Sequence, residues 1–385
     1  MKIALYYPYI HLRSGVERTI LEILKRSRHE WHVFTNFYDR GSTYAAFRDF
    51  EDKITELNRI SVKRSYVNTL RSAFVIANQK IPDGFDILWV HNEGLGSFIN
   101  FKNKAIPRIC FCHTPLKIIY DRELRIDYLK KNFRKAPFYL LFSFLFKIID
   151  RKAFSLYDYC FCVSNEVKER ILKNKLLLKN KLEVIYGGVD TESFSGDVEY
   201  GNYFFQPTRI KWWKNIELAI NAFNLMQKEC KELQDFRLVI AGELYPTNMR
   251  YYNKLKNMVN KNIIIKINST EQEILNLYRD CRAVLSTTLN EDFGLTVLEG
   301  FSFSKPVVAV NRGGPKEIIR NGVTGFLSSE NPEEYADYMA RLAEDKDFAV
   351  KMGVEARKDA MKYNWDDFVN YIDNFIQLRY PPYGG

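Results

Sequence analysis

Long hydrophobic runs are missing from this 385-residue chain. No stretch approaches the roughly 20 apolar residues that a membrane-spanning helix needs. A disorder-promoting composition is missing too, because 46% of the residues are hydrophobic and 15% are aromatic. The chain is too long for one ordinary hydrophobic core, so its length predicts a globular protein of two domains.

Motifs for common cofactors are also missing. Neither half carries the G-x-G-x-x-G pattern at its first turn, which counts against a nicotinamide-dependent enzyme. No Asp-x-Asp pair stands at a strand end to hold a divalent ion, so we expect no metal and no cofactor. Four of the six cysteines form two Cys-Phe-Cys units, at 110–112 and 160–162. Both units lie in apolar, strand-like runs, which predicts buried free thiols in a reducing compartment, with a zinc site as the weaker alternative.

The charge is strongly basic, with a net value of +10 at pH 7. No zinc-finger, RNP-type or basic-zipper signature accompanies it, so we do not expect nucleic acid as a partner. Basic residues concentrate at 102–152, around an aromatic run at 136–146. Such a segment is suited to an anionic membrane surface, and burial of the run inside the first domain is the alternative. The apolar start at 1–7 is too short for a signal peptide and predicts a strand in a cytoplasmic protein.

Strands and helices alternate along the chain, which predicts parallel sheets. Strands are expected at 3–7, 31–35, 86–90, 108–112, 159–163, 203–206, 236–241, 262–266, 282–286 and 306–310. Helices are expected at 16–26, 66–79, 122–154, 165–174, 214–227, 249–259 and 271–278. A polar stretch at 186–202 is interpreted as a linker. We therefore expect two Rossmann-like domains, 1–190 and 191–363, with ligands at the carboxyl ends of their strands.

The stretch 291–299 combines two glutamates with the start of a helix. Glu291 lies on the loop after the strand at 282–286, and Phe293 and Gly294 open a helix that carries Glu299. A helix N-terminus accepts an anion such as a phosphate, and each glutamate is able to accept hydrogen bonds from sugar hydroxyls. The grouping suits a nucleotide-sugar, and an amphipathic helix with solvated acids is the alternative.

Further motifs stand in a fixed order around this stretch. They are Ser14-Gly15-Val16-Glu17-Arg18, Cys112-His113-Thr114-Pro115, Val163-Ser164-Asn165, Gly188-Val189-Asp190, Arg209 with Lys214, and Gly313-Gly314-Pro315-Lys316-Glu317. With this set the chain resembles, nearly end to end, the retaining glycosyltransferases of family 4. It is most similar to bacterial and archaeal mannosyltransferases of O-antigen and glycan assembly. The resemblance implies the α/β GT-B fold: two Rossmann-like domains facing each other across a cleft, with a helix at 364–385 that returns to the N-terminal domain.

The resemblance also implies roles for residues in the reaction. Arg209 and Lys214 would clamp the diphosphate and stabilise the charge of the leaving group, as a metal does elsewhere. Glu291 would hold hydroxyls of the donor sugar, and His113, at a strand end, would face that sugar. His91 is a weaker candidate, for the acceptor side.

Other residues would bind the nucleotide. Gly15 would approach the diphosphate through its backbone N–H, although the family usually has two glycines where this chain has Ser14-Gly15. Glu299 would hold the ribose. The remaining contacts would come from Ile267 and Asn268 to the base, and from Phe293, Gly294, Leu295 and Thr296 to the phosphate.

The implied reaction moves a hexose from a nucleoside-diphosphate sugar to a lipid-linked or glycan acceptor, with retention and without metal. Mannose from GDP-mannose is the first choice. No pair of carboxylates marks a glycosidase-like nucleophile, so front-face displacement is preferred. The expected place is peripheral, at the cytoplasmic face of the membrane. A sugar phosphorylase or sucrose-synthase-like enzyme of the same fold and a non-catalytic, membrane-associated scaffold are the alternatives.

Overall fold

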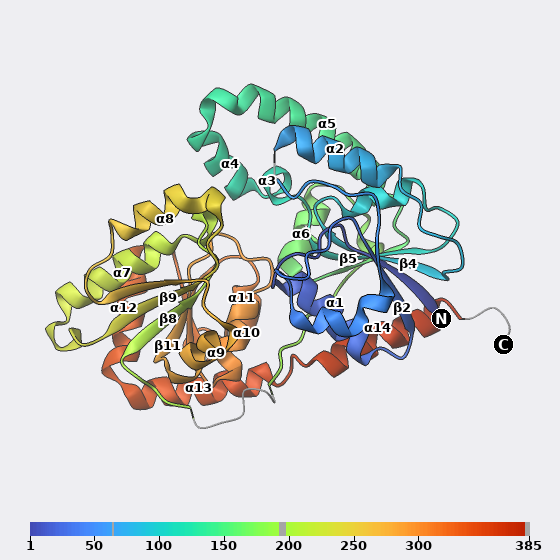
Figure 1. The fold of residues 1–385 in the computed structure, drawn as a ribbon. Helices are drawn as coiled ribbons and strands as arrows, with labels where there is room; N and C mark the ends of the chain where they lie inside the picture. Colours follow the sequence, from blue (N-terminus) through green and yellow to red (C-terminus); the bar gives the residue numbers. More distant parts are fainter. Residues whose placement is uncertain (64, 192–197, 382–385) are drawn as a thin grey trace. The chain divides into compact units, whose positions relative to one another are not determined.

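The computed structural model describes residues 1–63, 65–191 and 198–381 (Figure 1). The chain divides into two compact units, Met1–Gly187 with Trp365–Gly385, and Gly188–Asn364. Part of the predicted linker, 192–197, lies outside the described residues. Each unit is built on one parallel sheet, so the predicted pair of Rossmann-like sheets is confirmed.

The first sheet has the strand order β3-β2-β1-β4-β5-β6-β7, and all its neighbours pair in parallel. The central strands are apolar on both faces, as expected of a parallel sheet that helices cover on both sides. The strands are β1 (Lys2–Tyr6), β2 (Glu30–Thr35), β3 (Ile54–Glu56), β4 (Ile87–Glu93), β5 (Arg108–Thr114), β6 (Tyr159–Cys162) and β7 (Leu182–Val184).

Helices of two kinds accompany this sheet. The α-helices are α1 (Gly15–Arg26), α2 (Tyr66–Ala77), α3 (Lys117–Tyr120), α4 (Arg122–Lys131), α5 (Ala136–Phe154), α6 (Asn165–Lys173) and α14 (Trp365–Arg379). The 3-10 helices are η1 (Ala45–Lys53), η2 (Gly96–Phe101), η3 (Phe133–Lys135) and η4 (Lys179–Lys181).

The helix α14 belongs to the first unit although it follows the whole second unit in the sequence. It lies beside α1 (Figure 1), where the Arg26 Nε donates to Asp366 at 3.0 Å and the Ser27 hydroxyl donates to Asp373 at 2.6 Å. Its Phe368 packs edge-on against Phe111 of β5, with ring centroids 5.5 Å apart. The last helix therefore covers part of the core of the first unit.

The second sheet has the order β10-β9-β8-β11-β12-β13, again all parallel. Its strands are β8 (Tyr203–Pro207), β9 (Arg237–Gly242), β10 (Ile263–Ile267), β11 (Ala283–Ser286), β12 (Val307–Val310) and β13 (Gly325–Ser328). Its helices are η5 (Trp212–Lys214), α7 (Ile216–Glu229), η6 (Lys231–Leu233), η7 (Pro246–Asn248), α8 (Met249–Lys256), α9 (Glu271–Asp280), α10 (Leu295–Ser302), α11 (Pro315–Ile318), α12 (Pro332–Glu344) and α13 (Lys346–Ala360).

The helical stretch predicted at 122–154 is present but is divided, because the chain breaks between α4 and α5. Asn132 leaves helical geometry, with φ −131° and ψ 40°, and its side chain donates to the Tyr128 carbonyl. Pro137 then stands in the first turn of α5, where its missing N–H costs nothing. The strand ends predicted at Val90 and Cys112 are also too early, so His91 and His113 lie inside β4 and β5.

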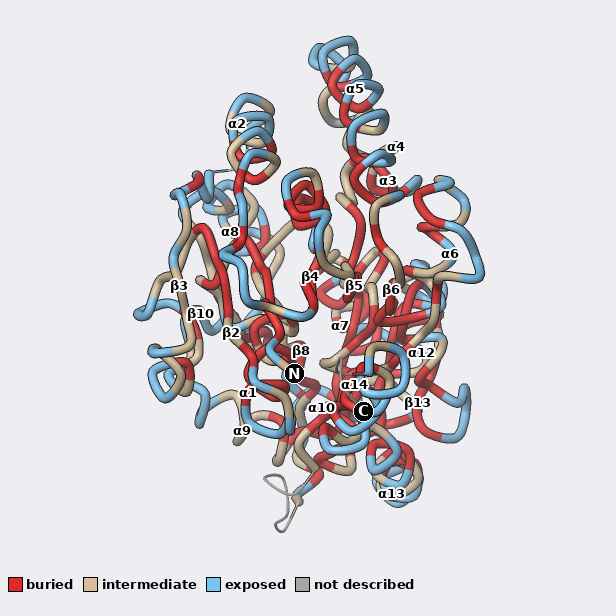
Figure 2. Tube along the Cα trace, turned by 90° about the vertical axis from the view of Figure 1, so that its right-hand side faces the viewer, coloured by how far each residue is buried: buried red, intermediate tan, exposed pale blue. Residues whose placement is uncertain are grey.

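The cysteine prediction is confirmed for the thiols at 110–112 and 160–162. All four are buried and none of them forms a disulfide, and Cys110 and Cys112 stand in register with Cys160 and Cys162 on neighbouring strands. Figure 2 shows that buried residues follow the strands, while the upper turns of α2 and α5 are largely exposed. Within the described ranges, no helix has both the length and the apolar character needed to cross a membrane.

Candidate active site

The strand order reverses direction once in each sheet, between β1 and β4 and between β8 and β11. Ligands of doubly wound sheets bind outside the carboxyl ends of the strands at such a reversal. In the second unit the loops at this place are 208–215, after β8, and 287–294, after β11. Arg209 and Lys214 lie on the first loop and Glu291 lies on the second. The topology therefore brings the predicted cations and one predicted glutamate to the same sheet edge.

Lys214 and Glu291 form an ion pair, in which Nζ lies 2.7 Å from Oε2. Their side chains are 14% and 22% exposed, so the pair is accessible but partly shielded from water. The main chain under Lys214 is held separately, since its carbonyl accepts from the Thr287 hydroxyl at 2.8 Å. The Gln206 amide on β8 in turn donates to Thr287. The two loops are thus joined by a polar network at the strand ends.

Close backbone approach fixes the loop that carries Glu291. The Gly314 N–H donates to the Glu291 carbonyl at 2.8 Å. A Cβ on Gly313, which has φ +65°, would lie 2.0 Å from that same carbonyl oxygen. A Cβ on Gly314 would lie equally close to the Phe293 carbonyl. Only glycine fits at both positions, which explains why two glycines stand opposite the glutamate loop.

The helix α10 begins with an open N-terminus. Its N-cap is Gly294, with φ +111°, and this residue has no side chain to accept from the first N–H groups. Gly300 packs the same helix tightly on the sheet, where its Cβ would meet Val284 and Val307 at 3.1 Å. The unfilled hydrogen-bonding capacity and the positive end of the helix dipole make this turn, at 294–296, suited to an anion.

Glu299 is held by a residue that the sequence did not single out. The Tyr278 hydroxyl, at the end of α9, donates to Oε2 of Glu299 at 2.6 Å. Tyr278 is buried, and burial together with the neighbouring carboxylate raises the pKa of its hydroxyl well above the usual value. A neutral phenol therefore fixes one oxygen of the glutamate that is expected to hold the ribose.

The other predicted residues of the second unit also lie at the carboxyl ends of its strands. Asn268 follows β10 in the left-handed region, with φ +56°, and its side-chain oxygen accepts from the Leu244 N–H at 3.3 Å. Its neighbour Ile267 is 41% exposed, although it is an isoleucine. Among the described residues, Arg209 has no side-chain hydrogen bond or ion pair. Its guanidinium is thus available to a ligand in a way that the paired ammonium of Lys214 is not.

In the first unit, the helix α1 is capped by its own residues. The Ser14 side chain accepts from the Val16 N–H and donates to Glu17, whose other oxygen accepts from the Leu12 N–H at 3.2 Å. Burial raises the pKa of Glu17 to about 7. Gly15 is the first residue of this helix. The serine that replaces the family's first glycine is therefore a helix cap.

His91 and His113 lie side by side on neighbouring strands, with Nδ1 of His91 2.8 Å from Nε2 of His113. The register between β4 and β5 shifts after Asn92, so Glu93 pairs with Thr114 and His113 is the extra residue of a bulge. Bulges re-aim side chains and are frequent next to active sites. Behind His91, the Trp89 indole N–H donates to its Nε2 at 3.2 Å. Burial lowers the pKa of His91 well below the usual value.

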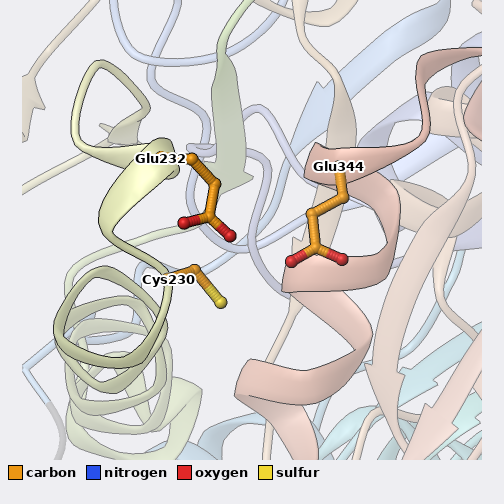
Figure 3. Close-up of side chains that lie close together, drawn as sticks. All are labelled: Cys230, Glu232 and Glu344. Carbon is orange, nitrogen blue, oxygen red and sulfur yellow. The ribbon is translucent and has the colours of Figure 1, made fainter.

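Only one group of possible metal ligands occurs in the described part of the chain: Cys230, Glu232 and Glu344 (Figure 3). It lies where α7 passes into η6, before β9 begins, and at the end of α12. This is the amino end of β9, the opposite edge from the loops that carry Lys214 and Glu291. Both glutamates are exposed, and the cluster has no connection with the candidate site.

Comparisons with known proteins identify the family. The family described as "Glycosyl transferases group 1" matches residues 190–359, and "Glycosyltransferase Family 4" matches residues 13–193. Together they span most of the chain, which therefore belongs to the family 4 glycosyltransferases. A solved structure of HepE from Anabaena, in complex with UDP and glucose, has a TM-score of 0.72 at 17% identity and covers 98% of this chain and 99% of that one. This likeness confirms the GT-B fold.

The relatives found by sequence carry different names. An uncharacterized glycosyltransferase of Methanocaldococcus jannaschii is 25% identical and covers 95% of this chain and 94% of that protein. The alpha-1,3/1,6-mannosyltransferase ALG2 of Mus musculus is 25% identical, covering 69% of this chain and 66% of that protein. A probable sucrose-phosphate synthase of Thermosipho melanesiensis is 30% identical, covering 52% and 48%. The chain is thus similar both to a protein named as a mannosyltransferase and to one named as a probable sucrose-phosphate synthase.

Proposed function

We propose that this protein transfers a hexose, with mannose from GDP-mannose as the first choice, to a lipid-linked or glycan acceptor with retention of configuration. The observation that carries the proposal is the Lys214–Glu291 pair beside the open N-terminus of α10. A cation, a carboxylate and free backbone N–H groups at one sheet edge fit a sugar joined to a diphosphate. The similarity to ALG2, a mannosyltransferase by name, supports the choice of sugar.

The proposed division of labour follows from the chemistry of each group. Arg209 and Lys214 stabilise the negative charge that grows on the departing diphosphate, so no metal is required. The α10 turn at 294–296 binds the phosphates, Glu291 holds donor-sugar hydroxyls and Glu299 holds the ribose. His113 acts on the reacting sugar, and Ile267, Asn268 and Gly15 complete the nucleotide contacts. In this scheme the Lys214 ammonium, which is paired with Glu291 in the structure, moves to the diphosphate oxygens when the donor binds. Glu291 then becomes available to the sugar hydroxyls.

A thermal-shift panel of nucleoside diphosphates and their sugars tests the donor. A ligand at 100 times its dissociation constant stabilises a protein by about 2.7 kcal/mol, which is a readable shift. We expect GDP-mannose and GDP to shift the wild type, with UDP-glucose as the comparison donor. Transfer is then measured with the preferred donor, and the anomeric configuration of the product is read by NMR. No shift with any nucleotide sugar, or an inverted product, contradicts the proposal.

A sucrose-phosphate-synthase-like or phosphorylase activity is the second candidate, and the 30% identity to the Thermosipho protein favours it. Such an enzyme uses a soluble sugar phosphate or phosphate as the second substrate. Incubating the preferred donor with sugar phosphates, inorganic phosphate or a polyprenyl-linked saccharide separates the candidates. Product with the lipid-linked saccharide alone supports the first proposal, whereas product with a sugar phosphate alone supports the second.

We also propose that the protein attaches to an anionic membrane surface through the first unit. The helix α5 buries Tyr139, Phe142 and Phe146 but exposes another apolar face, in which Phe138 is 73% and Leu141 60% exposed. The remaining exposed apolar residues of this face are Leu140, Phe144, Leu145, Ile148 and Ile149. One side of the helix is therefore core, and the other side is exposed and is the side proposed to meet the membrane.

A second helix adds to this surface. The helix α2 exposes Val67, Leu70 and Phe74, and its Tyr66 ring lies 5.0 Å from that of Phe142 on α5. Exposed basic residues lie on the same two helices and on α4 and η3: Arg71, Arg122, Lys130, Arg134, Lys135, Arg151 and Lys152. Exposed apolar side chains together with exposed cations on neighbouring elements match the chemistry of an anionic leaflet, where each cation contributes about 1 kcal/mol.

Vesicle co-sedimentation tests the membrane surface. We expect binding to phosphatidylglycerol vesicles at low salt, release as salt rises, and loss of binding when Lys130, Arg134 and Lys135 become glutamate. The same charge change at the exposed Lys228, Lys231 and Arg237 of the second unit is the matched control. Nucleotide affinity should stay unchanged in both variants. A wild type that remains unbound at low salt, or equal losses in both variants, rules this attachment out.

A further inference from the structure

The hydrogen bonds of His91 and His113 determine which ring nitrogen of each histidine carries the proton. A neutral histidine carries its proton on Nδ1 or on Nε2, and its partners decide which nitrogen is protonated. The indole N–H of Trp89 is a donor only, and it points at Nε2 of His91 from 3.2 Å. Nε2 of His91 is therefore the acceptor. His91 is fully buried, where the neutral form is favoured, so its proton is on Nδ1.

The proton on His91 in turn decides the protonation of His113. The Nδ1–H of His91 lies 2.8 Å from Nε2 of His113 and donates to it. Nε2 of His113 is therefore also an acceptor, and neutral His113 carries its proton on Nδ1. A proton on Nε2 of His113 would face the N–H of His91 across 2.8 Å, with two donors and no acceptor.

We propose that Trp89 and His91 are positioning residues that hold His113 as the tautomer with its proton on Nδ1. His113 then presents an N–H donor, rather than a basic nitrogen, to an oxygen on the far side of its ring. The inference rests on the proposed function only in taking that oxygen to belong to the reacting sugar. His113 stabilises oxygen atoms in this arrangement and does not remove the acceptor proton through Nε2.

The surroundings make the arrangement rigid. Trp89 is fully buried between aromatic rings, stacked on Phe111 at 6.4 Å and on Phe161 at 5.7 Å between centroids. The two histidine rings are nearly parallel, with 25° between their planes. Phe111 also packs against His113, with centroids 4.9 Å apart. These rings are closely packed on both strands. The Trp89 indole therefore cannot rotate away from His91 without disturbing the core around β4 and β5.

Nitrogen NMR of the protein labelled with 15N-histidine tests the tautomer directly. The chain has five histidines, and loss of one set of signals in His113→Ala assigns that residue. We expect a protonated Nδ1 and an unprotonated Nε2 for His113 in the wild type without any ligand. In Trp89→Phe, which removes the indole N–H and keeps an aromatic ring in the stack, we expect His91 and His113 to become mixtures of tautomers. A protonated Nε2 on wild-type His113 overturns the proposal whatever the activity is.

Kinetics test whether the arrangement serves the reaction. His91→Leu removes the donor to His113, whereas His91→Asn keeps an amide N–H near the place of Nδ1. We expect kcat to fall about 10- to 100-fold in His91→Leu with little change in KM, and to recover largely in His91→Asn. Unchanged kcat in His91→Leu, with His113 still protonated on Nδ1, overturns the positioning role. If His113→Ala itself retains full kcat, the assignment of His113 to the reaction fails, while the NMR result still decides the tautomer.

Discussion

Removing the ammonium of Lys214 is the most informative single change, because its two consequences differ in size. The pair to Glu291 is short, at 2.7 Å, and partly shielded from water. The loop beneath it is held by other contacts, since the Lys214 carbonyl accepts from Thr287 and the Leu289 N–H donates to the Trp213 carbonyl at 3.1 Å. Lys214→Ala therefore removes a charge and leaves the loop in place.

The effect on stability should be small. Exposed ion pairs contribute about 0.2–1 kcal/mol to the free energy of unfolding. The interaction energy between two residues in contact is about 0.5–3 kcal/mol. For a pair this accessible we expect about 1 kcal/mol, which lowers the melting temperature of a unit this large by about 2–4 °C. The effect on turnover should be larger. Losing one preformed donor to a developing negative charge costs about 2.7–4 kcal/mol, so kcat should fall about 100- to 1000-fold.

The assay compares Lys214→Ala, Glu291→Gln and the double variant by melting temperature and by kcat. Lys254→Ala is the matched control, because its Nζ lies 2.9 Å from Glu217 on the outer helices of the same unit. We expect the control to lose no turnover. If Lys214→Ala keeps at least a tenth of the wild-type kcat while the double-variant cycle shows full coupling in stability, the pair is structural and the reasoning is refuted.

Three further expectations concern Tyr278, the buried Asp150 of α5, and the requirement for a metal. Tyr278→Phe removes the hydrogen bond to Glu299. The variant should bind a ribonucleoside diphosphate about tenfold more weakly, with no change in its affinity for the deoxyribose analogue. Equal losses of affinity for both would contradict a role at the ribose. Burial raises the pKa of Asp150 to about 7, above that of the unfolded chain. The contribution of Asp150 to the free energy of unfolding is thus complete below about pH 4, and it falls by about 1.4 kcal/mol per pH unit as the pH rises toward 7. The melting temperature of Asp150→Asn should therefore increase relative to that of the wild type between pH 5 and pH 8. A difference in melting temperature that stays constant with pH would contradict this. Transfer should persist in excess EDTA, because Arg209 and Lys214 supply the charge; loss that Mg²⁺ or Mn²⁺ reverses would show a metal site instead.

The repeating apolar strands were predictable because the central strands of parallel sheets are buried on both faces. Runs such as Ile87–Val90 and Val307–Val310 carry that signal in the sequence itself. The strand β3 has only three residues, none of them buried, and gave no signal. The break at Asn132 was missed because its neighbours on both sides favour helix, and the helix is interrupted only over Asn132 and the short 3-10 turn η3.

The site was predictable as a set of residues but not as a set of contacts. Glu291 and Glu299 were visible from their spacing around a helix start. Their partners were not, because Lys214 precedes Glu291 by 77 residues and Tyr278 precedes Glu299 by 21. Such pairs depend on which strands are neighbours and on their register. The same holds for Trp89, which an apolar strand pattern marks only as core.

The helix α14 has a consequence for how the protein is made. It packs on Phe111 and bonds to Arg26 and Ser27, yet the ribosome adds it after every residue of the second unit. Domains generally fold in the order of synthesis, at about 5–20 residues per second. The first unit therefore lacks α14 for many seconds after its last strand has been synthesised, and the Phe111 side of its sheet stays uncovered during that time. The second unit, a continuous stretch, is complete earlier, so the half of the protein that is begun first is finished last.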